Sequence, residues 1–276
     1  MSWVARLKLD YSLQAERSVA RFAHDGPLRI LQSLYPEGDR ICHNVLVHPP
    51  SGLVGGDTLD MQVNVETGAH GLVTTPGATR FYRSEAGLAT QQVHARVQDG
   101  ARLEWLPLEA LAYSGCDALN LARFTLAPTA ELMTWDITAL GLPHAQQPFE
   151  RGTFRQHLEI PGVWLERGAI TAEDERLMNS PLGLAGRRCM ATLVFAAGSA
   201  IAADRAEAAL EAARAAIETS PLRLQAGATQ PHPQVIVLRV LAPVVEPAMQ
   251  LLRPVWAAWR QALWGLPGTV PRLWNL

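Results

Sequence analysis

The feature that most constrains the fold of this chain is an alternation of apolar and polar residues that begins near the N-terminus. Across residues 3–13 the apolar residues recur at every second position. Side chains of a β-strand point alternately to opposite faces, so this period of two predicts a strand buried on one face. The same alternation returns at residues 59–65 and 93–97.

Shorter β-like runs fill the gaps between these strands. Gly, Pro and Asp clusters separate them at the short spacing that is typical of an antiparallel β fold. No helical pattern interrupts them before about residue 200, so βαβ units are not expected. The runs are residues 28–34, 44–48, 70–75, 101–106, 119–126, 131–137, 154–160 and 163–167.

The C-terminal quarter changes character. Residues 204–219 predict a helix that Asp204 caps, with Glu207 three residues further on. Residues 234–241 predict a strand buried on both faces, and residues 247–264 a second helix with Pro254 at a kink or in its first turn. No linker, low-complexity tract or repeat is visible. The sequence therefore predicts one mostly β domain over residues 1–276, with two α-helices near the C-terminus.

The charge balance excludes several classes of function. The 24 basic and 26 acidic residues give a net charge of −2, so there is no large excess of positive charge to bind nucleic acid or anionic lipid. Lys8 is the only lysine and follows Leu7, so the Gly-Lys pair of a Walker A loop is missing. We therefore expect no nucleotide to bind this chain. Charged residues make up only 18%, which fits either large interfaces or simple Ala and Gly enrichment.

The cysteines and the N-terminus indicate a cytoplasmic protein. Three cysteines are widely spaced, without a C-x-x-C pair, as in a reducing compartment. The N-terminus carries Arg6, Lys8 and Asp10 and has no apolar signal core. The longest uncharged run is too short to span a bilayer.

A glycine-rich loop at residues 52–57 is the most conspicuous local motif. Gly55 and Gly56 permit backbone angles and close approaches that a Cβ would hinder, and they place Asp57 at the end of the loop. An ordinary turn between strands is the alternative. The loop lacks the lysine and the helix that a phosphate cradle needs.

Metal-ligand patterns are weak. Cys42, His43 and His48 lie near one another, and thiol with imidazole suits nickel, copper or zinc. On one strand, however, His43 and His48 would face opposite sides. A buried cysteine and a surface histidine are the alternative reading.

Three carboxylates lie on apolar strands beside bulky residues: Glu104, Asp136 and Glu166. Each either belongs to the solvent-facing half of an alternating strand or lines an internal polar passage. A buried carboxylate requires a partner or a cation.

Three tryptophans fall within nine residues of the second helix: Trp256, Trp259 and Trp264. One helix face does not readily bury three indoles within its own domain, and Trp is enriched among interface anchors. These residues are therefore candidates for partner binding, with a core helix as the alternative.

In the order and spacing of its motifs the chain resembles the urease accessory protein D family (UreD/UreH). Each motif is modest alone, but together they are specific and run through most of the chain. They are Gly26-Pro27-Leu28-Arg29, Tyr35-Pro36-Glu37-Gly38, Cys42-His43, His48-Pro49-Pro50-Ser51-Gly52, Gly52-Leu53-Val54-Gly55-Gly56-Asp57, Thr74 to Ser84, Leu103-Glu104-Trp105-Leu106-Pro107 and Pro271-Arg272-Leu273-Trp274.

The resemblance implies a chaperone of nickel insertion rather than an enzyme. The family joins an F-type accessory protein and a G-type GTPase on the urease apoenzyme, and GTP hydrolysis would come from that partner. Its fold is a helix-like stack of β-strands with two helices. Nickel is its transient cargo, thought to move through an internal polar passage.

We expect the nickel path to involve Asp57, Asp136 and Glu166, with Cys42 and His43 as further candidates. Scattered oxygen ligands hold nickel more weakly than a compact His/Cys cluster, which suits transfer. Solvated strand residues are the alternative. Two other classes of protein stay open: a β-helical lyase or glycosidase with paired carboxylates, and a binding module without metal.

The chain departs from the family pattern near residue 142. Leu142 stands where the family usually has Arg, Gln147 and Pro148 replace a Gly-Glu pair before Phe149, and Leu108 stands where Gln is frequent. The resemblance therefore assigns no role of the family's Arg and Glu to these positions.

Overall fold

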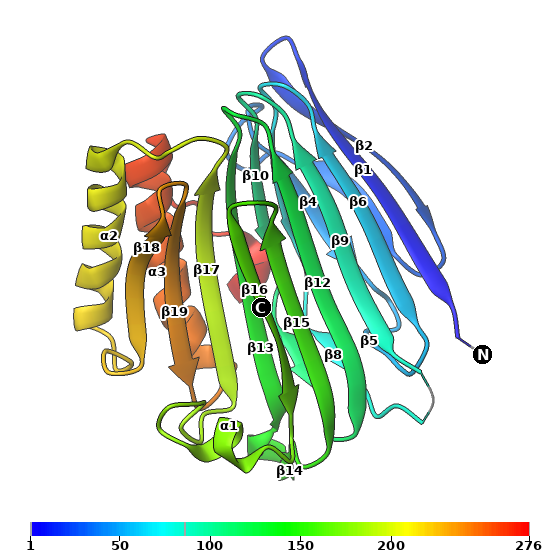
Figure 1. Ribbon diagram of the computed structural model, residues 1–276. Coiled ribbons are helices and arrows are strands. Elements are labelled where there is room, and N and C mark those ends of the chain that lie inside the picture. The colour runs from blue at the N-terminus through cyan, green and yellow to red at the C-terminus, as the bar shows by residue number, and fades with distance from the viewer. Residues whose placement is uncertain (1, 86, 276) are drawn as a thin grey trace.

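The computed structural model describes residues 2–85 and 87–275, which form two β-sheets and three α-helices (Figure 1). The first sheet has the strand order β16-β15-β12-β9-β6-β1-β2. Its strands are β1 (Val4–Gln14), β2 (Arg17–Asp25), β6 (Thr58–Val65), β9 (Ala89–Val97), β12 (Cys116–Leu126), β15 (Gly152–Ile160) and β16 (Trp164–Thr171).

The second sheet has the order β18-β19-β17-β13-β10-β7-β4-β3, with four short strands beside this path. The main strands are β3 (Arg29–Leu34), β4 (Cys42–Val47), β7 (His70–Thr74), β10 (Arg102–Leu106), β13 (Glu131–Leu142), β17 (Cys189–Ala197), β18 (Ala226–His232) and β19 (Val235–Ala242). The short ones are β5 (Gly52–Leu53), β8 (Thr79–Phe81), β11 (Ala110–Ala112) and β14 (Gln147–Pro148).

The chain winds between the two sheets like a solenoid. A strand of the first sheet is followed by one of the second and by a short strand, as in β6–β7–β8 and then β9–β10–β11. Each turn stacks on the one before it. The expectation of a mostly β fold of stacked strands is confirmed.

The expectation of antiparallel pairing is wrong for the centre of both sheets. β1, β6, β9, β12 and β15 pair in parallel, as do β4, β7, β10 and β13. Parallel neighbours need a long crossover, which is usually a helix. Here the crossover is a strand of the opposite sheet. Short turns therefore connect strands of different sheets, and the central strands that are neighbours within one sheet run parallel.

One apolar core fills the space between the sheets. Alternate residues of the first strand, Ala5, Leu7, Leu9 and Tyr11, are all buried in it. They meet inward residues of the second sheet, such as Leu103. The predicted half-buried strand at residues 3–13 is therefore confirmed.

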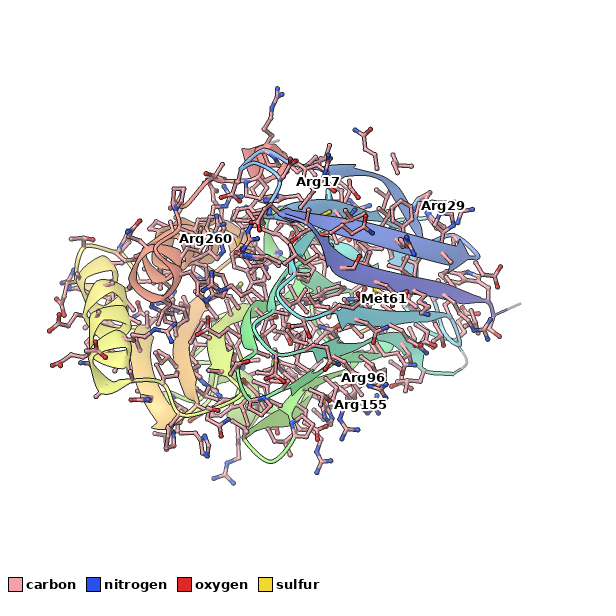
Figure 2. The ribbon with its side chains drawn as sticks, turned by 90° about the horizontal axis from the view of Figure 1, so that it is seen from above. Arg17, Arg29, Met61, Arg96, Arg155 and Arg260 are labelled. Carbon is pink, nitrogen blue, oxygen red and sulfur yellow. The ribbon has the colours of Figure 1, made fainter. Side chains whose placement is uncertain are left out.

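A second core lies between the second sheet and two helices. These are α2 (Ala203–Glu218) and α3 (Val245–Trp264), which pack on each other and on β17 to β19. Seen from above, the helices lie at one side of the molecule, away from the strands of the first sheet (Figure 2). The remaining helices are the short α1 (Glu175–Asn179) and the 3-10 turns η1 (Pro143–Ala145) and η2 (Arg272–Asn275).

The two predicted late helices are present, but one predicted cap is wrong. Ala202 is the N-cap of α2 and makes no side-chain cap hydrogen bond, while Asp204 lies in the first turn. Pro254 lies inside α3, and Gly265 ends that helix in the left-handed conformation, with φ 66°. Glycine is the usual residue at this position, because it adopts the left-handed conformation without a Cβ penalty.

Candidate functional site

A row of polar side chains crosses the otherwise apolar space between the sheets. Gln91, Asn120 and Gln156 lie opposite one another on β9, β12 and β15. The Gln91 amide accepts from Thr79 Oγ1 at 3.0 Å and donates to Asn120 at 3.1 Å. Asn120 and Gln156 donate to the Asp136 carboxylate at 3.4 and 2.8 Å. We call these five residues the polar row: Thr79, Gln91, Asn120, Gln156 and Asp136.

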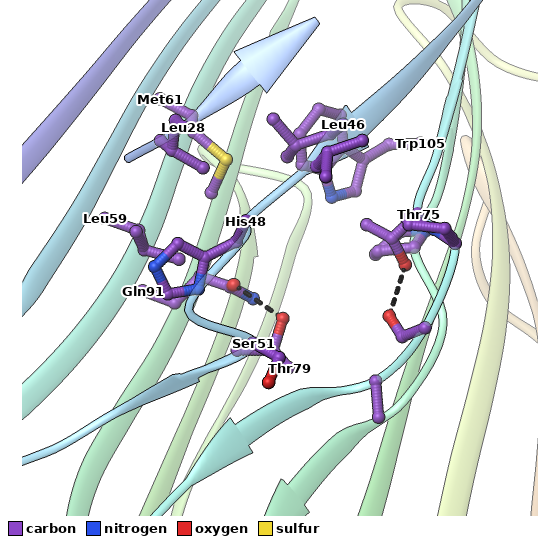
Figure 3. A pocket seen from close by; sticks show the side chains of 15 residues that line it. Leu28, Leu46, His48, Ser51, Leu59, Met61, Thr75, Thr79, Gln91 and Trp105 are labelled. Atoms are coloured by element: carbon purple, nitrogen blue, oxygen red, sulfur yellow. Dashed lines mark hydrogen bonds between the residues drawn. The ribbon is translucent and has the colours of Figure 1, made fainter. Parts of the chain in front are cut away.

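Two cavities adjoin the polar row. The first, of about 100 Å³, is lined by Thr79 and Gln91 together with His48, Ser51 and apolar side chains (Figure 3). The second, of about 20 Å³, is lined by Gln91, Asn120 and Asp136. One probe sphere of about 10–15 Å³ is enough for a water molecule, so the second cavity has room for a single water molecule or a bare ion, and the first has room for several water molecules. Gln91 lines both cavities, as do Met61, Trp105 and Pro107.

Asp136 is the most perturbed carboxylate of this site. Its pKa is raised to about 7, chiefly by burial and also by the Glu166 carboxylate, although the amides of Gln156 and Asn120 oppose the shift. Two carboxylates that share a poorly solvated space favour a bound proton or cation. The structure therefore brings together two of the three acids that the sequence singled out for the metal path.

Glu166, on β16, forms the outer end of this arrangement. Its carboxylate lies 3.0 Å from the guanidinium of Arg239, which is half-exposed. Burial raises the pKa of Glu166, and the Arg239 charge opposes this. Glu166 is therefore mostly buried, unlike the solvent-facing strand residue that was the alternative, but its partner Arg239 reaches solvent.

Asp57 lies apart from the polar row. Its buried carboxylate accepts hydrogen bonds from the backbone N–H groups of Trp3, at 3.2 Å, and Val54, at 3.0 Å. These bonds close the glycine-rich loop onto the start of β1. The Asp57 charge also acts on His48. Burial lowers the pKa of His48 overall, and the Asp57 carboxylate partly opposes this shift.

The two glycines of that loop differ in their backbone. Gly56 has φ +86°, and a Cβ there would approach the Ser2 Cβ to 2.8 Å. Gly55 is not among the residues of positive φ. The expected need for glycine therefore applies to Gly56.

Cys42 and His43 point to opposite faces of β4. Cys42 belongs to the core between the sheets. His43 lies on the other face, 2.9 Å from the Glu37 carboxylate. Within residues 2–85 and 87–275, no three His, Cys, Asp or Glu side chains are grouped so that they could hold a metal ion.

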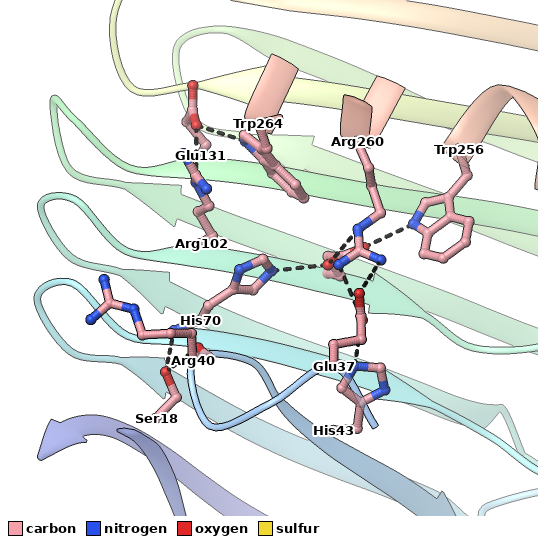
Figure 4. A network of polar contacts seen from close by, with 11 residues as sticks. Ser18, Glu37, Arg40, His43, His70, Arg102, Glu131, Trp256, Arg260 and Trp264 are labelled. Carbon is pink, nitrogen blue, oxygen red and sulfur yellow. Dashed lines mark hydrogen bonds and ion pairs between the residues drawn. The ribbon is translucent and has the colours of Figure 1, made fainter. Parts of the chain in front are cut away.

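A buried ionic cluster lies on the helix side of the second sheet (Figure 4). Arg260 of α3 is ion-paired with Glu37 at 2.9 Å and Glu104 at 3.5 Å. His43 contacts Glu37, and His70 contacts Glu104, each at 2.9 Å. Hydrogen bonds from His70 and Trp256, together with the Arg260 charge, hold the pKa of Glu104 low although burial alone would raise it.

The three tryptophans of α3 are buried, so the argument that one helix cannot bury them within its own chain is wrong. Each indole N–H has an acceptor: Glu104 for Trp256, the Ala209 carbonyl for Trp259, and Glu131 for Trp264. α3 achieves this because it contacts both β17 and α2. Their role in partner binding stays a prediction.

Three of the positions that depart from the family pattern, Leu142, Gln147 and Pro148, meet at one end of β13. Leu142 pairs with Gln147, and Gly141 pairs with Pro148. Gln147 is exposed, and Leu142 is half-buried. Neither belongs to the polar row.

Sequence reasoning missed the amides of the polar row and the partners of Arg260. Gln91, Asn120 and Gln156 occupy inward positions of apolar alternation, which was the available signal. Their convergence on Asp136 depends on the parallel register of three strands.

The fold and the site define a solenoid-like β protein with a buried polar row. None of the helices within the described residues is long and apolar enough to cross a membrane. A family model described as UreD urease accessory protein matches residues 4–275. The chain belongs to the UreD urease accessory protein family.

Curated relatives with the same description are similar to this chain in sequence along its whole length. The urease accessory protein UreD of Variovorax paradoxus is 64% identical over 274 residues, 99% of both chains. That of Paracidovorax citrulli is 64% identical over 276 residues, all of both chains. That of Leptothrix cholodnii is 54% identical over 277 residues, again covering both chains.

Proposed function

We propose that this protein is a chaperone of urease maturation that helps insert nickel into the urease apoenzyme. Its family and its relatives, which are named urease accessory proteins, support this role. We propose that it works in the cytoplasm with an F-type accessory protein and a G-type GTPase. The GTPase would supply nucleotide hydrolysis, because the single lysine, Lys8, does not follow a glycine.

The observation that carries the nickel-transfer proposal is the placement of Asp136. This carboxylate is buried, has a pKa of about 7 and lies beside a water-sized cavity. Near neutral pH, a cation can take the place of its proton at little electrostatic cost. The amide oxygens of Gln91 and Asn120 add hard ligands along the same row.

Oxygen ligands in a row suit passage better than storage. Nickel binds carboxylate and amide oxygen more weakly than imidazole and thiolate. A conduit must bind its ion and release it again, so several weak sites are favourable. The expected nickel path therefore keeps Asp136 and Glu166, while Asp57 would act by shaping the loop beside the first cavity.

The test is nickel loading of urease by variants of Asp136 and Glu166. Asp136→Ala and Glu166→Ala, singly and together, should still co-purify with the accessory partners and apo-urease. The urease they activate should hold less nickel per active site, with the largest loss in the double variant. Asp60→Ala is the matched control, because Asp60 lies on the outer side of the first sheet, which also contains Glu166, and Gln92 donates to it there at 3.1 Å.

Two results would contradict the proposal. Normal nickel loading by the double variant, in an intact complex, would show that the path avoids these residues. Normal loading of urease by cells that lack this protein would remove the chaperone role itself.

A further inference from the structure

A cavity of about 460 Å³ opens beside the buried ionic cluster, on the side of the second sheet that α3 covers, and it is separate from the polar row. Its wall contains two arginines, Arg40 from the loop before β4 and Arg102 from β10, with His70 and Glu37 beside them. Gly68 and Gly100 contribute wall without side chains. Figure 4 shows Arg40 and Arg102 flanking His70.

The ion pairs that Arg40 and Arg102 form in this structure are weak or shared with other groups. Arg40 pairs with Glu16, and both side chains are mostly exposed, so this pair contributes little. Arg102 lies 3.4 Å from Glu131. Glu131 already accepts from Arg205 and from the Trp264 indole, each at 2.7 Å.

The carboxylate of Glu37 in this wall is already paired with residues outside the cavity. Glu37 is the acid at this cavity, and Arg260 and His43 hold its carboxylate. Arg40 and Arg102 therefore leave the wall with an excess of positive charge. Guanidinium groups bind carboxylates through charge-assisted, often bidentate hydrogen bonds.

We propose that this cavity binds a carboxylate between Arg40 and Arg102, with His70 as a further donor. Glu104 takes the hydrogen bond of His70 Nε2, which leaves Nδ1 for a ligand. A neutral ring would present a lone pair there, whereas a protonated ring would present an N–H. The charged groups around His70 are Glu104, Arg260, Arg102, Glu37 and Arg40.

Binding should therefore be linked to proton uptake. Burial lowers the pKa of His70, so the free ring is mostly neutral at pH 8 and gains protons only toward pH 6 and below, whereas a simple carboxylate is ionised throughout. Carboxylate affinity should rise as the pH falls over this interval. Guanidinium groups stay charged throughout, so Arg40 and Arg102 supply binding at both pH values.

The experiment is a calorimetric titration of the full-length protein, alone or in its soluble partner complex, with sodium acetate against equal sodium chloride. Acetate should bind in the millimolar range. Arg40→Gln and Arg102→Gln should each weaken it about tenfold, the loss of one charge-assisted contact. Arg96→Gln is the control, because Arg96 projects from the outer face of the first sheet (Figure 2).

A second arm identifies the source of the carboxylate. A short peptide rich in glutamate that binds more tightly than acetate, with the same loss in Arg40→Gln, would indicate an acidic segment of a partner protein. Acetate binding without that gain would indicate a free carboxylate ligand. No acetate binding beyond chloride, or equal binding by Arg40→Gln and wild type, would overturn the proposal, provided that circular dichroism shows both proteins folded.

Discussion

The guanidinium of Arg260 lies 2.9 Å from the carboxylate of Glu37, although 223 residues separate them along the chain. Both side chains are buried, and Arg260 has no exposed surface. This pair joins the last long helix to the loop between β3 and β4. The end of the chain is thus held to one of its first turns by charge as well as by apolar packing.

Removing this buried cation should strongly destabilise the protein. In Arg260→Met, Glu37 and Glu104 lose their shared cation, which typically costs about 3–5 kcal/mol for a buried pair. Urea denaturation of the variant should show that loss. Arg96→Met, at an exposed position, should change the free energy of unfolding by less than about 0.5 kcal/mol. A loss below about 1 kcal/mol in Arg260→Met would contradict the assigned role of the cluster.

The Asp136 carboxylate should make stability depend on pH. Its pKa is about 7 in the folded protein and near 3.8 when solvated, so the folded state binds more protons between these values. Stability from this group is complete below the lower value and decreases as the pH rises, by about 1.4 kcal/mol per unit inside the window.

Asp136→Asn removes this dependence. The variant should therefore gain stability relative to wild type as the pH rises from 5 to 8, as measured by urea denaturation at each pH. A constant difference between the two proteins across that interval would show that Asp136 does not titrate there. Asp60→Asn serves as the control, because Asp60 is half-exposed.

Gly56→Val should strain the glycine-rich loop. The residue has φ +86° and its Cβ would clash with Ser2, so we expect a loss of about 1–3 kcal/mol and weaker urease activation. Gly227→Val, on the edge strand β18 with ordinary φ and open space around it, should be nearly neutral. Unchanged thermal stability and full activation in Gly56→Val would contradict this account.

Trp274 should anchor the C-terminal segment. Its indole N–H donates to Thr74 at 2.8 Å, and its ring lies 4.8 Å from that of Trp135 and 5.0 Å from that of Trp256. Trp274→Ala should cost about 3–5 kcal/mol, measured as a lower urea midpoint. Val270→Ala, at a partly exposed position nearby, should have a small effect. Similar midpoints for the two variants would show that the segment does not stabilise the core.

Much of the local structure followed from periodicity in the sequence. The alternation at residues 3–13 and 59–65 predicted β1 and β6, and the helices expected at residues 204–219 and 247–264 correspond to α2 and α3. These patterns are short-range, because burial of one face of a strand or helix selects residues two, three or four positions apart. The resemblance to UreD proteins came from local motifs in the same way.

Several errors came from relations between distant segments. The Trp256, Trp259 and Trp264 indoles are buried because α2 and the second sheet cover α3, which the helix alone does not reveal. Antiparallel pairing was expected because short turns do not show which sheet receives the next strand.

The sequence by itself determined which segments are strands and helices, that the chain lacks a Walker A loop, and which family motifs it carries. Only the tertiary structure decided which polar residues meet. Gln91, Asn120 and Gln156 reach Asp136 because parallel strands align them, and Arg260 reaches Glu37 because α3 packs on the second sheet. Burial and opposed charge depend on which residues are neighbours in space. Carboxylates that look alike along the chain therefore differ in the folded protein: Asp136 has a raised pKa, Asp57 accepts backbone hydrogen bonds that close a loop, and Glu37 is ion-paired with Arg260.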